Sequence, residues 1–228
     1  MSVSPVSPVP SGPPAPAGEG VIRAVSRRDD ILREAARLFA AHGFRGVSIE
    51  QLGAAVGISG PAIYRHFSGK NAILAAMLVG ASEKLNADGV AAVRASRTPR
   101  EALERLVALH VTFALDEPHL IVVQDRDLAN LPRAEEHRVR RLQRSYVETW
   151  ASVLRGVDAG LGVADSRARA HAMFGLLNST PHSATELNRA AVAAILRDMS
   201  LRAAHVDPAD IDPADIDPAG ASPPGQVG

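Results

Sequence analysis

Apolar residues recur every three or four positions along most of the chain, a period that places them on one face of a helix. The first such stripe runs over residues 30–42 and ends at His42-Gly43. The same period predicts helices over residues 71–95, from 98 to a break at Pro118, from 133 past 153, over 165–177 and up to about 204. No segment alternates apolar and polar residues over the length of a strand. We therefore expect an all-α fold.

Polar residues ahead of these stripes indicate where helices begin, because a side-chain oxygen can accept from the free amides of a first turn. Pro99 at a first helical position supports the helix that follows Thr98. The expected caps are Ser48 with Gln51, Ser68, Thr98 with Glu101, Asp165, and Ser183 with Glu186. The short apolar run 120–123 fits either a strand or a buried helical turn, and its helical neighbours favour the turn.

Residues 48–70 predict two short helices joined by a tight turn and followed at once by a third helix. Gly57 suits the left-handed conformation that ends a helix, and Ser59 is expected to cap the second helix, PAIYRHF (61–67). Ala54 and Ala55 are small enough to let the two helices approach closely. This pattern is typical of a helix-turn-helix, whose second helix enters the major groove of DNA.

The segment from Asp30 to Lys70 closely resembles the DNA-binding domain of the TetR family of transcriptional repressors. The resemblance rests on the helix ending at His42, on Gly-Phe at 43–44, and on Tyr-Arg-His-Phe at 64–67 followed by Lys70. It implies an all-α homodimer with an N-terminal three-helix helix-turn-helix domain and a variable C-terminal ligand-binding domain. It also implies a repressor that a small-molecule effector releases from its operator.

The residue types in this segment suggest how it would contact a duplex. A hydroxyl or a cation near a helix start can hold a phosphate, and an arginine can reach a guanine with two hydrogen bonds. The resemblance places backbone and base contacts at Tyr64 and His66. The candidate DNA-binding residues are Ser48, Ser59, Gly60, Pro61, Tyr64, Arg65, His66 and Lys70, with 59–61 and 65 expected to be exposed towards base edges. A packing role for Tyr64, a capping role alone for Ser48 and a surface position for His66 remain open.

The net charge of zero conceals an uneven distribution. Residues 21–70 hold eight Arg and Lys against four Asp and Glu, a net +4 that would attract phosphates. The five Asp after residue 206 face no basic residue, so that end carries −5. Because charges are screened within about 8 Å at physiological salt, the acidic end does not cancel the basic segment.

Composition divides the chain into four parts. Residues 1–20 are dense in Pro, Ser and Gly, and residues 206–228 repeat DPADI, so we expect a disordered arm and a disordered tail. Binding of a basic partner by the tail is an alternative. Between them, residues 21–70 would form the DNA-binding domain and residues 71–205 the helical ligand-binding and dimerisation domain.

Amphipathic and polar residues on otherwise apolar helix faces are candidates for an effector cavity, although each also suits a core. They are His110, Phe113, Tyr146, Trp150, Phe174 and Asn178. Segments 124–150 and 176–183 resemble actinobacterial TetR-type regulators of lipid and acyl-CoA breakdown, which implies an acyl-CoA thioester as effector. Arg138, Arg140, Arg141 and Arg144 could meet its phosphates. Glu136, four residues before Arg140, instead favours a solvated ion-paired face.

Small residues among larger apolar ones in the last two predicted helices favour a symmetric interface between two copies of the chain. A monomer core is the alternative. The residues concerned are Ala168, Ala172, Phe174, Leu177, Leu187, Ala191, Ala194 and Ile195.

Several function classes are disfavoured. The sequence has no P-loop, dinucleotide glycine fingerprint or GxSxG elbow, so we expect no enzyme and no cofactor. The absence of cysteine excludes disulfides and fits a reducing cytosol, and no apolar run approaches the ~18 residues of a membrane helix. We therefore expect a cytoplasmic DNA-binding regulator. An effector-independent DNA-binding protein, or a metal site at His110, His171 or His182, remains an alternative.

Overall fold

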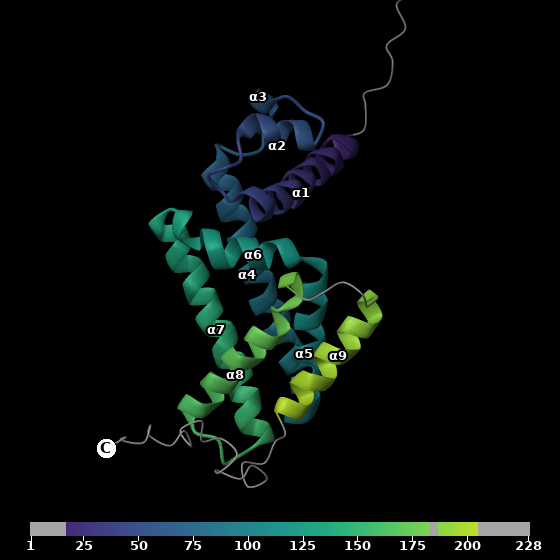
Figure 1. Ribbon diagram of the computed structural model, residues 1–228, viewed down its shortest axis with the longest axis vertical. Coiled ribbons are helices and arrows are strands. Elements are labelled where there is room, and N and C mark those ends of the chain that lie inside the picture. Colours follow the sequence, from purple (N-terminus) through teal and green to yellow (C-terminus); the bar gives the residue numbers. More distant parts are fainter. Residues whose placement is uncertain (1–16, 183–186, 205–228) are drawn as a thin grey trace, which may run out of the picture.

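The computed structural model of the chain describes residues 17–182 and 187–204 (Figure 1). Every regular element within these two ranges is a helix, which confirms the all-α prediction. In chain order they are α1 (Ala17–His42), α2 (Ile49–Ala55), α3 (Gly60–Ile63), α4 (Lys70–Arg94), α5 (Pro99–Asp116), α6 (Pro118–Asp127), the 3-10 helix η1 (Leu128–Asn130), α7 (Arg133–Val157), α8 (Val163–Leu177), the 3-10 helix η2 (Thr180–His182) and α9 (Arg189–Ala203).

The helices are arranged around α4, which runs from one end of the molecule into the other (Figure 1). The first three helices gather at one end, where α1 contacts both α2 and α4. At the other end α4 packs against α5 and α7, and α8 packs against α7 and α9. Helix α6 contacts α1, α4 and α5, so it lies between the two ends.

Two apolar cores correspond to these two ends. The first is built from α1 to α3 together with the first half of α4, and it also takes in Val123 of α6, Leu131 between η1 and α7, and Val139 of α7. The second is centred on Trp150 and joins α5, α7, α8 and α9. Because one core draws residues from both ends, α6 and the start of α7 are tied to the N-terminal helices by packing.

Two of the predicted helix starts are confirmed in detail. The Ser48 hydroxyl accepts from the Gln51 amide at 3.2 Å, while the Ser48 N–H donates to the Gln51 side chain at 2.8 Å. This is a complete capping box at the start of α2. Thr98 accepts from the Glu101 amide at 3.1 Å, and Pro99 is the first residue of α5.

Other predicted caps are wrong. Helix α4 begins at Lys70 behind Gly69, so Ser68 does not cap it. Ser59 does stand at the N-cap position of α3, as expected, but its side chain makes no capping hydrogen bond. Helix α8 begins at Val163, which places Asp165 inside the first turn. A polar residue close to a helix start therefore locates the end of a helix only to within a few residues.

Helix ends at the termini also differ from the sequence-based boundaries. Helix α1 begins at Ala17, inside the segment 1–20 that was expected to be a disordered arm. Helix α9 begins at Arg189, where Asn188 accepts from the Ala191 amide at 3.0 Å. The capping box expected at Ser183 and Glu186 lies outside the described residues, as do residues 1–16 and the tail 206–228.

Pro118 separates α5 from α6 and stands at the first position of α6, and the run 120–123 is helical as predicted.

In the described part of the chain, no single helix is long and apolar enough to span a membrane. Helix α5 and the α6–η1 segment reach that length and apolarity only when taken together, and they are bent by 85° where they meet.

Candidate DNA interface and effector cavity

Two buried glycines let α2 and α3 pack closely. A Cβ on Gly53 would lie 2.8 Å from the Ile58 carbonyl oxygen, and a Cβ on Gly60 would lie 3.3 Å from the Glu50 Cα. The expectation that Gly60 is exposed towards base edges is therefore wrong: Gly60 faces α2. Ala54 and Ala55, which were expected to allow the close approach, are both exposed. A buried glycine tolerates shorter backbone distances than alanine because it has no Cβ.

The predicted second helix of the helix-turn-helix is shorter than expected. Helix α3 ends at Ile63, and residues 64–66 continue as turns rather than as the helix 61–67. Ile63 and Phe67 are buried and hold the segment against the first core. Tyr64 is 59% exposed, and Ser59, Pro61 and Arg65 are also exposed. These four and the half-buried His66 lie in and directly around α3, and we call residues 48–70, which carry them, the reader.

Lys70 has a structural partner. Its ammonium donates to the Val47 carbonyl at 2.7 Å and lies 4.7 Å from the centre of the Phe44 ring. An ammonium carries three N–H bonds, so this contact leaves donors for a phosphate. Ser48 is similar, because its hydroxyl oxygen accepts within the capping box while its own hydrogen is still available as a donor.

Two arginines of α1 support the reader from behind. Arg27 donates to the Val56 carbonyl at 2.8 Å, and Arg28 donates to the His66 carbonyl at 2.8 Å. The Arg28 guanidinium also lies 4.1 Å from the centre of the Phe67 ring. These cations satisfy carbonyls next to α2 and α3, so part of the local positive charge also fixes the orientation of both helices.

The second end of the molecule contains a cavity of about 220 Å³, which we call the effector chamber. Five of the six predicted effector residues line it: His110, Phe113, Tyr146, Phe174 and Asn178. They come from α5, α7 and α8 and from the residue that ends α8. Trp150 does not line the chamber. Its side chain is fully buried behind His110 and Phe174, so its prediction as an effector contact is wrong and it belongs to the core.

His110 is the polar centre of the chamber. Its Nε2 lies 3.0 Å from the Asn178 side-chain oxygen, and its Nδ1 lies 3.3 Å from the Tyr146 hydroxyl. The Asn178 oxygen can only accept, so Nε2 carries the hydrogen and Nδ1 accepts from Tyr146. Burial lowers the pKa of His110 to about 4, against a partial opposing effect of the Asn178 hydrogen bond. The imidazole is thus neutral at pH 7.

The end of α6 holds the end of α1. Arg126 donates to the carbonyls of Phe39 and Ala40 in the last turn of α1, and its guanidinium pairs with Asp127 at 3.0 Å. The buried Asp127 carboxylate accepts from the Phe44 amide at 3.3 Å. We call Arg126, Asp127 and Phe44 the interdomain latch. The adjoining part of α6 supplies Leu120, Ile121 and Gln124 to the effector chamber.

The arginines of α7 have different surroundings. Arg140 pairs with Glu136 at 2.8 Å, as the solvated alternative expected. Arg138 pairs with Glu83 of α4. Arg141 and Arg144 are exposed and stand next to Leu142 and Gln143, which line the effector chamber.

Within the described ranges, no three His, Asp or Glu side chains are grouped so that they could hold a metal ion.

Two family models match the chain. Residues 31–77 match the bacterial regulatory proteins of the tetR family, and residues 96–203 match the tetracyclin repressor-like C-terminal domain. The chain belongs to the TetR family. The first match covers α2, α3, the last part of α1 and the start of α4, while the second covers most of the residues that line the effector chamber. Membership confirms that the chain is a regulatory protein and not an enzyme.

Similar proteins extend this family assignment. The TetR-family chain is 29% identical over 130 residues to the HTH-type transcriptional regulator BetI of Rhizobium meliloti, a match over 56% of this chain. That match spans 62% of the relative, less than two thirds of its length. The crystal structure of the TetR regulator PfmR from Thermus thermophilus is 28% identical, with a TM-score of 0.65 over 75% of this chain and 97% of the other.

A third likeness concerns the fold alone. The structure of AibR in complex with isovaleryl coenzyme A and operator DNA superposes with a TM-score of 0.63 over 76% of this TetR-family chain and 97% of the other, at 17% identity.

Sequence reasoning missed the interdomain latch and the two packing glycines of this TetR-family chain. The sequence could have indicated Gly53 and Gly60 as packing positions, since both are glycines at the ends of an expected close helix contact. No such indication exists for Arg126 and Asp127, because the atoms they meet lie more than 80 residues away in the sequence.

Proposed function

We propose that this chain is a DNA-binding transcriptional regulator that acts as a homodimer and leaves its operator when a small molecule occupies the effector chamber. The exposed surface of Ser59, Pro61, Tyr64 and Arg65 beside a complete capping box is the observation that carries the DNA-binding part. Lys70 and Ser48 would hold phosphates on either side of it, and His66 would contact the backbone. Such a regulator would act in the cytoplasm, where bacterial DNA lies.

Dimerisation is supported by exposed apolar side chains on α8, α9 and the segment just before α9. Four of the five large apolar side chains that the structure leaves exposed lie there: Val163, Leu187, Ile195 and Met199. These side chains lie on or just before two helices that pack against each other, and we propose that they take part in an interface between two copies. Two copies joined through this surface would present two readers to successive turns of one duplex, as the symmetry of operators requires.

The effector chamber supports control by a small molecule with an acyl group, and an acyl-CoA thioester is the proposed class. Its walls are aromatic and aliphatic, and its volume of about 220 Å³ suits a short or branched acyl chain rather than a nucleotide. Gln124, Gln143 and Asn178 supply amide donors for a thioester carbonyl. The likeness to AibR, whose structure contains isovaleryl coenzyme A, is consistent with this class.

A route for the signal is present in the packing. An effector can change DNA affinity only by binding one arrangement of the protein better than another. Helix α6 both lines the effector chamber and holds α1 through the interdomain latch. Helix α4 also lines the chamber and leads directly into the reader. We propose that occupancy shifts these two helices and so changes the distance between the two readers.

The deciding experiment titrates the purified chain against a fluorescent fragment of its own upstream promoter at low and moderate salt, then adds acyl-CoA thioesters. We expect specific binding and a concentration-dependent release by at least one thioester. Failure to bind any promoter segment would reject the regulator. Binding with no release by any thioester would leave an effector-independent DNA-binding protein or a different effector class.

A further inference from the structure

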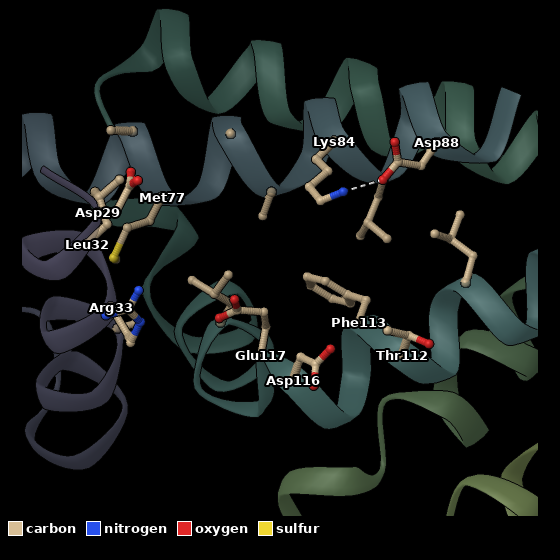
Figure 2. Close-up of a pocket in the computed structure, with 17 residues that line it drawn as sticks. Asp29, Leu32, Arg33, Met77, Lys84, Asp88, Thr112, Phe113, Asp116 and Glu117 are labelled. Carbon is tan, nitrogen blue, oxygen red and sulfur yellow. Dashed lines mark hydrogen bonds and ion pairs between the residues drawn. The ribbon is translucent and has the colours of Figure 1, made fainter. Parts of the chain in front are cut away.

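A second hollow adjoins the effector chamber. It is a groove of about 530 Å³ bounded by α1, α4 and α5, which we call the outer groove (Figure 2). Its lining includes apolar residues from all three helices, among them Leu32, Ala36, Met77 and Leu109. The outer groove and the effector chamber share Ala81, Leu85, Phe113 and Leu120. One layer of side chains therefore separates the two spaces.

Phe113 is the largest member of that layer. Figure 2 shows its ring extending from α5 towards α4, in the middle of the outer groove. On its other side the ring centre lies 5.8 Å from that of His110, inside the effector chamber. The side chain is half-buried and carries no polar group, so a rotation of the ring would break no hydrogen bond and would connect the two spaces.

The charges around the two spaces favour one orientation of a bound molecule. The outer groove is lined by Asp29, Asp88, Asp116 and Glu117 against Arg33 and Lys84, a net −2. Burial and the neighbouring Asp116 raise the pKa of Glu117, against the opposing charge of Arg33. Helix α7, which lines the effector chamber with Leu142 and Gln143, holds five Arg and two Glu over residues 133–144, a net +3 of which Arg138 is paired with Glu83 of α4. An anionic head group is favoured at α7 and disfavoured at the outer groove, whose floor suits an uncharged tail.

We propose that the outer groove receives the far end of an effector's acyl chain, and that Phe113 determines the chain length at which the effector first reaches it. This inference rests on the proposed acyl effector. A short branched acyl group fits inside the effector chamber. A longer chain must turn Phe113 aside, and it then meets Leu32 and Ala36 of α1. Since α1 belongs to the DNA-binding end, a long chain contacts that end directly, whereas a short chain acts only through α4 and α6.

Gly80 provides a clean test. It lies on α4 in the lining of the outer groove, and a Cβ placed there meets nothing within 4 Å. Gly80→Phe should therefore fill the outer groove without disturbing the fold, and Gly80→Ala is the matched control that leaves it open. Phe113→Ala opens the passage. Binding to the full-length chain is followed by the fluorescence of Trp150, the only tryptophan, which contacts the chamber residues His110 and Phe174.

The probes are straight-chain acyl-CoAs from butyryl to palmitoyl, the matching free fatty acids, and isovaleryl-CoA. Where the chain reaches the outer groove, each further methylene should tighten binding about fourfold. We expect Gly80→Phe to weaken palmitoyl binding at least about tenfold without changing isovaleryl binding, and Phe113→Ala to strengthen the binding of long chains. Binding of the free acids as tightly as the thioesters would identify a fatty acid as the source of the chain.

The outcomes separate this inference from the proposed function. If Gly80→Phe leaves palmitoyl binding unchanged, or weakens short and long chains equally, the outer groove is not the tail site, although acyl control of DNA binding stands. If no chain length binds to the protein in either form, the acyl effector and the tail site are both rejected.

Discussion

The Phe44 amide donates to the Asp127 carboxylate at 3.3 Å across a sequence separation of 83 residues. Phe44 stands in the link between α1 and α2, while Asp127 ends α6. The same carboxylate is paired with Arg126, whose guanidinium donates to two carbonyls at the end of α1. A cation at the carbonyl end of a helix is favourable for the helix dipole as well as for the free carbonyls.

Removing the Asp127 carboxylate should lower the stability of the fold and also weaken the response of DNA binding to the effector. In Asp127→Ala the Phe44 amide loses its partner and Arg126 loses its counter-ion, which we expect to cost about 2 kcal/mol of unfolding free energy. We also expect weaker release of DNA by the effector, because α6 no longer holds α1. Urea unfolding and promoter titrations with and without effector measure the two effects. Asp127→Asn keeps an acceptor oxygen, so both of its effects should lie between those of the wild type and Asp127→Ala. If the effector still releases the alanine variant from DNA as fully as the wild type, α4 alone carries the signal.

Tyr64→Ala should lower DNA affinity without changing stability. Its side chain is 59% exposed, so its removal should alter the unfolding free energy by less than about 0.5 kcal/mol. We expect promoter affinity to fall by roughly tenfold or more, corresponding to about 1.4 kcal/mol. Fluorescence anisotropy with the promoter fragment measures this, and Tyr64→Phe indicates the share of the hydroxyl. Unchanged affinity at low salt would remove Tyr64 from the interface.

Lys70→Ala should behave differently from Tyr64→Ala, because its ammonium donates to the Val47 carbonyl. We expect it to lower DNA affinity and also to lower the unfolding free energy by about 1 kcal/mol. Lys70→Met keeps the apolar stem over Phe44 while losing the charge, so the two variants separate packing from charge. The salt dependence of binding should become shallower in both. A variant with the wild-type salt slope would show that Lys70 contacts no phosphate.

Much of this architecture could be read from the sequence, since helical periodicity is a local property. The stripes over residues 30–42 and 133–153 and the capping box at Ser48 depend on neighbours within four positions. Five of the six predicted chamber residues were found because polar and aromatic side chains on apolar faces tend to converge on cavities. Trp150 shows the limit of that rule: the same stripe serves a cavity wall and a core, and only packing separates them.

Exposure within the reader was harder to predict for a related reason. Gly60 was expected at the surface, facing base edges, but its lack of a Cβ is what permits contact with Glu50 of α2. The interdomain latch and the outer groove depend on how α1, α5 and α6 meet. Those contacts join residues that are distant in the sequence, and no local pattern contains them.

Ile195→Glu tests the proposed dimer. Ile195 is 45% exposed on α9, so a charge there should not unfold the chain, but it would be buried in an interface and left unpaired. We expect a monomeric mass by light scattering and weaker promoter binding, because a monomer contacts only one half-site. Ala87→Glu on the exposed side of α4 is the matched control. A wild-type chain that is itself monomeric at micromolar concentration, with intact DNA binding, would contradict the dimer.

His110 should make the stability of the protein depend on pH in a definite direction. Its pKa is about 4 in the folded chain, whereas an unfolded histidine titrates near 6.5. Between these values the unfolded state binds a proton that the folded state does not. Stability is therefore fully present above about pH 6.5 and falls as the pH is lowered towards 4, by about 2 kcal/mol between pH 7 and pH 5.

The matched variant is His110→Gln, which has no titratable group in this range and can still donate to Asn178 through its amide. We expect it to lose less stability than the wild type between pH 7 and pH 5, with carboxylates common to both proteins cancelling in the comparison. Urea unfolding at the two pH values supplies the four free energies. Equal losses in both proteins would mean that water reaches His110 and that the effector chamber is not a dry site. A smaller loss in the variant would instead support a neutral imidazole at the centre of the chamber, suited to an uncharged acyl group.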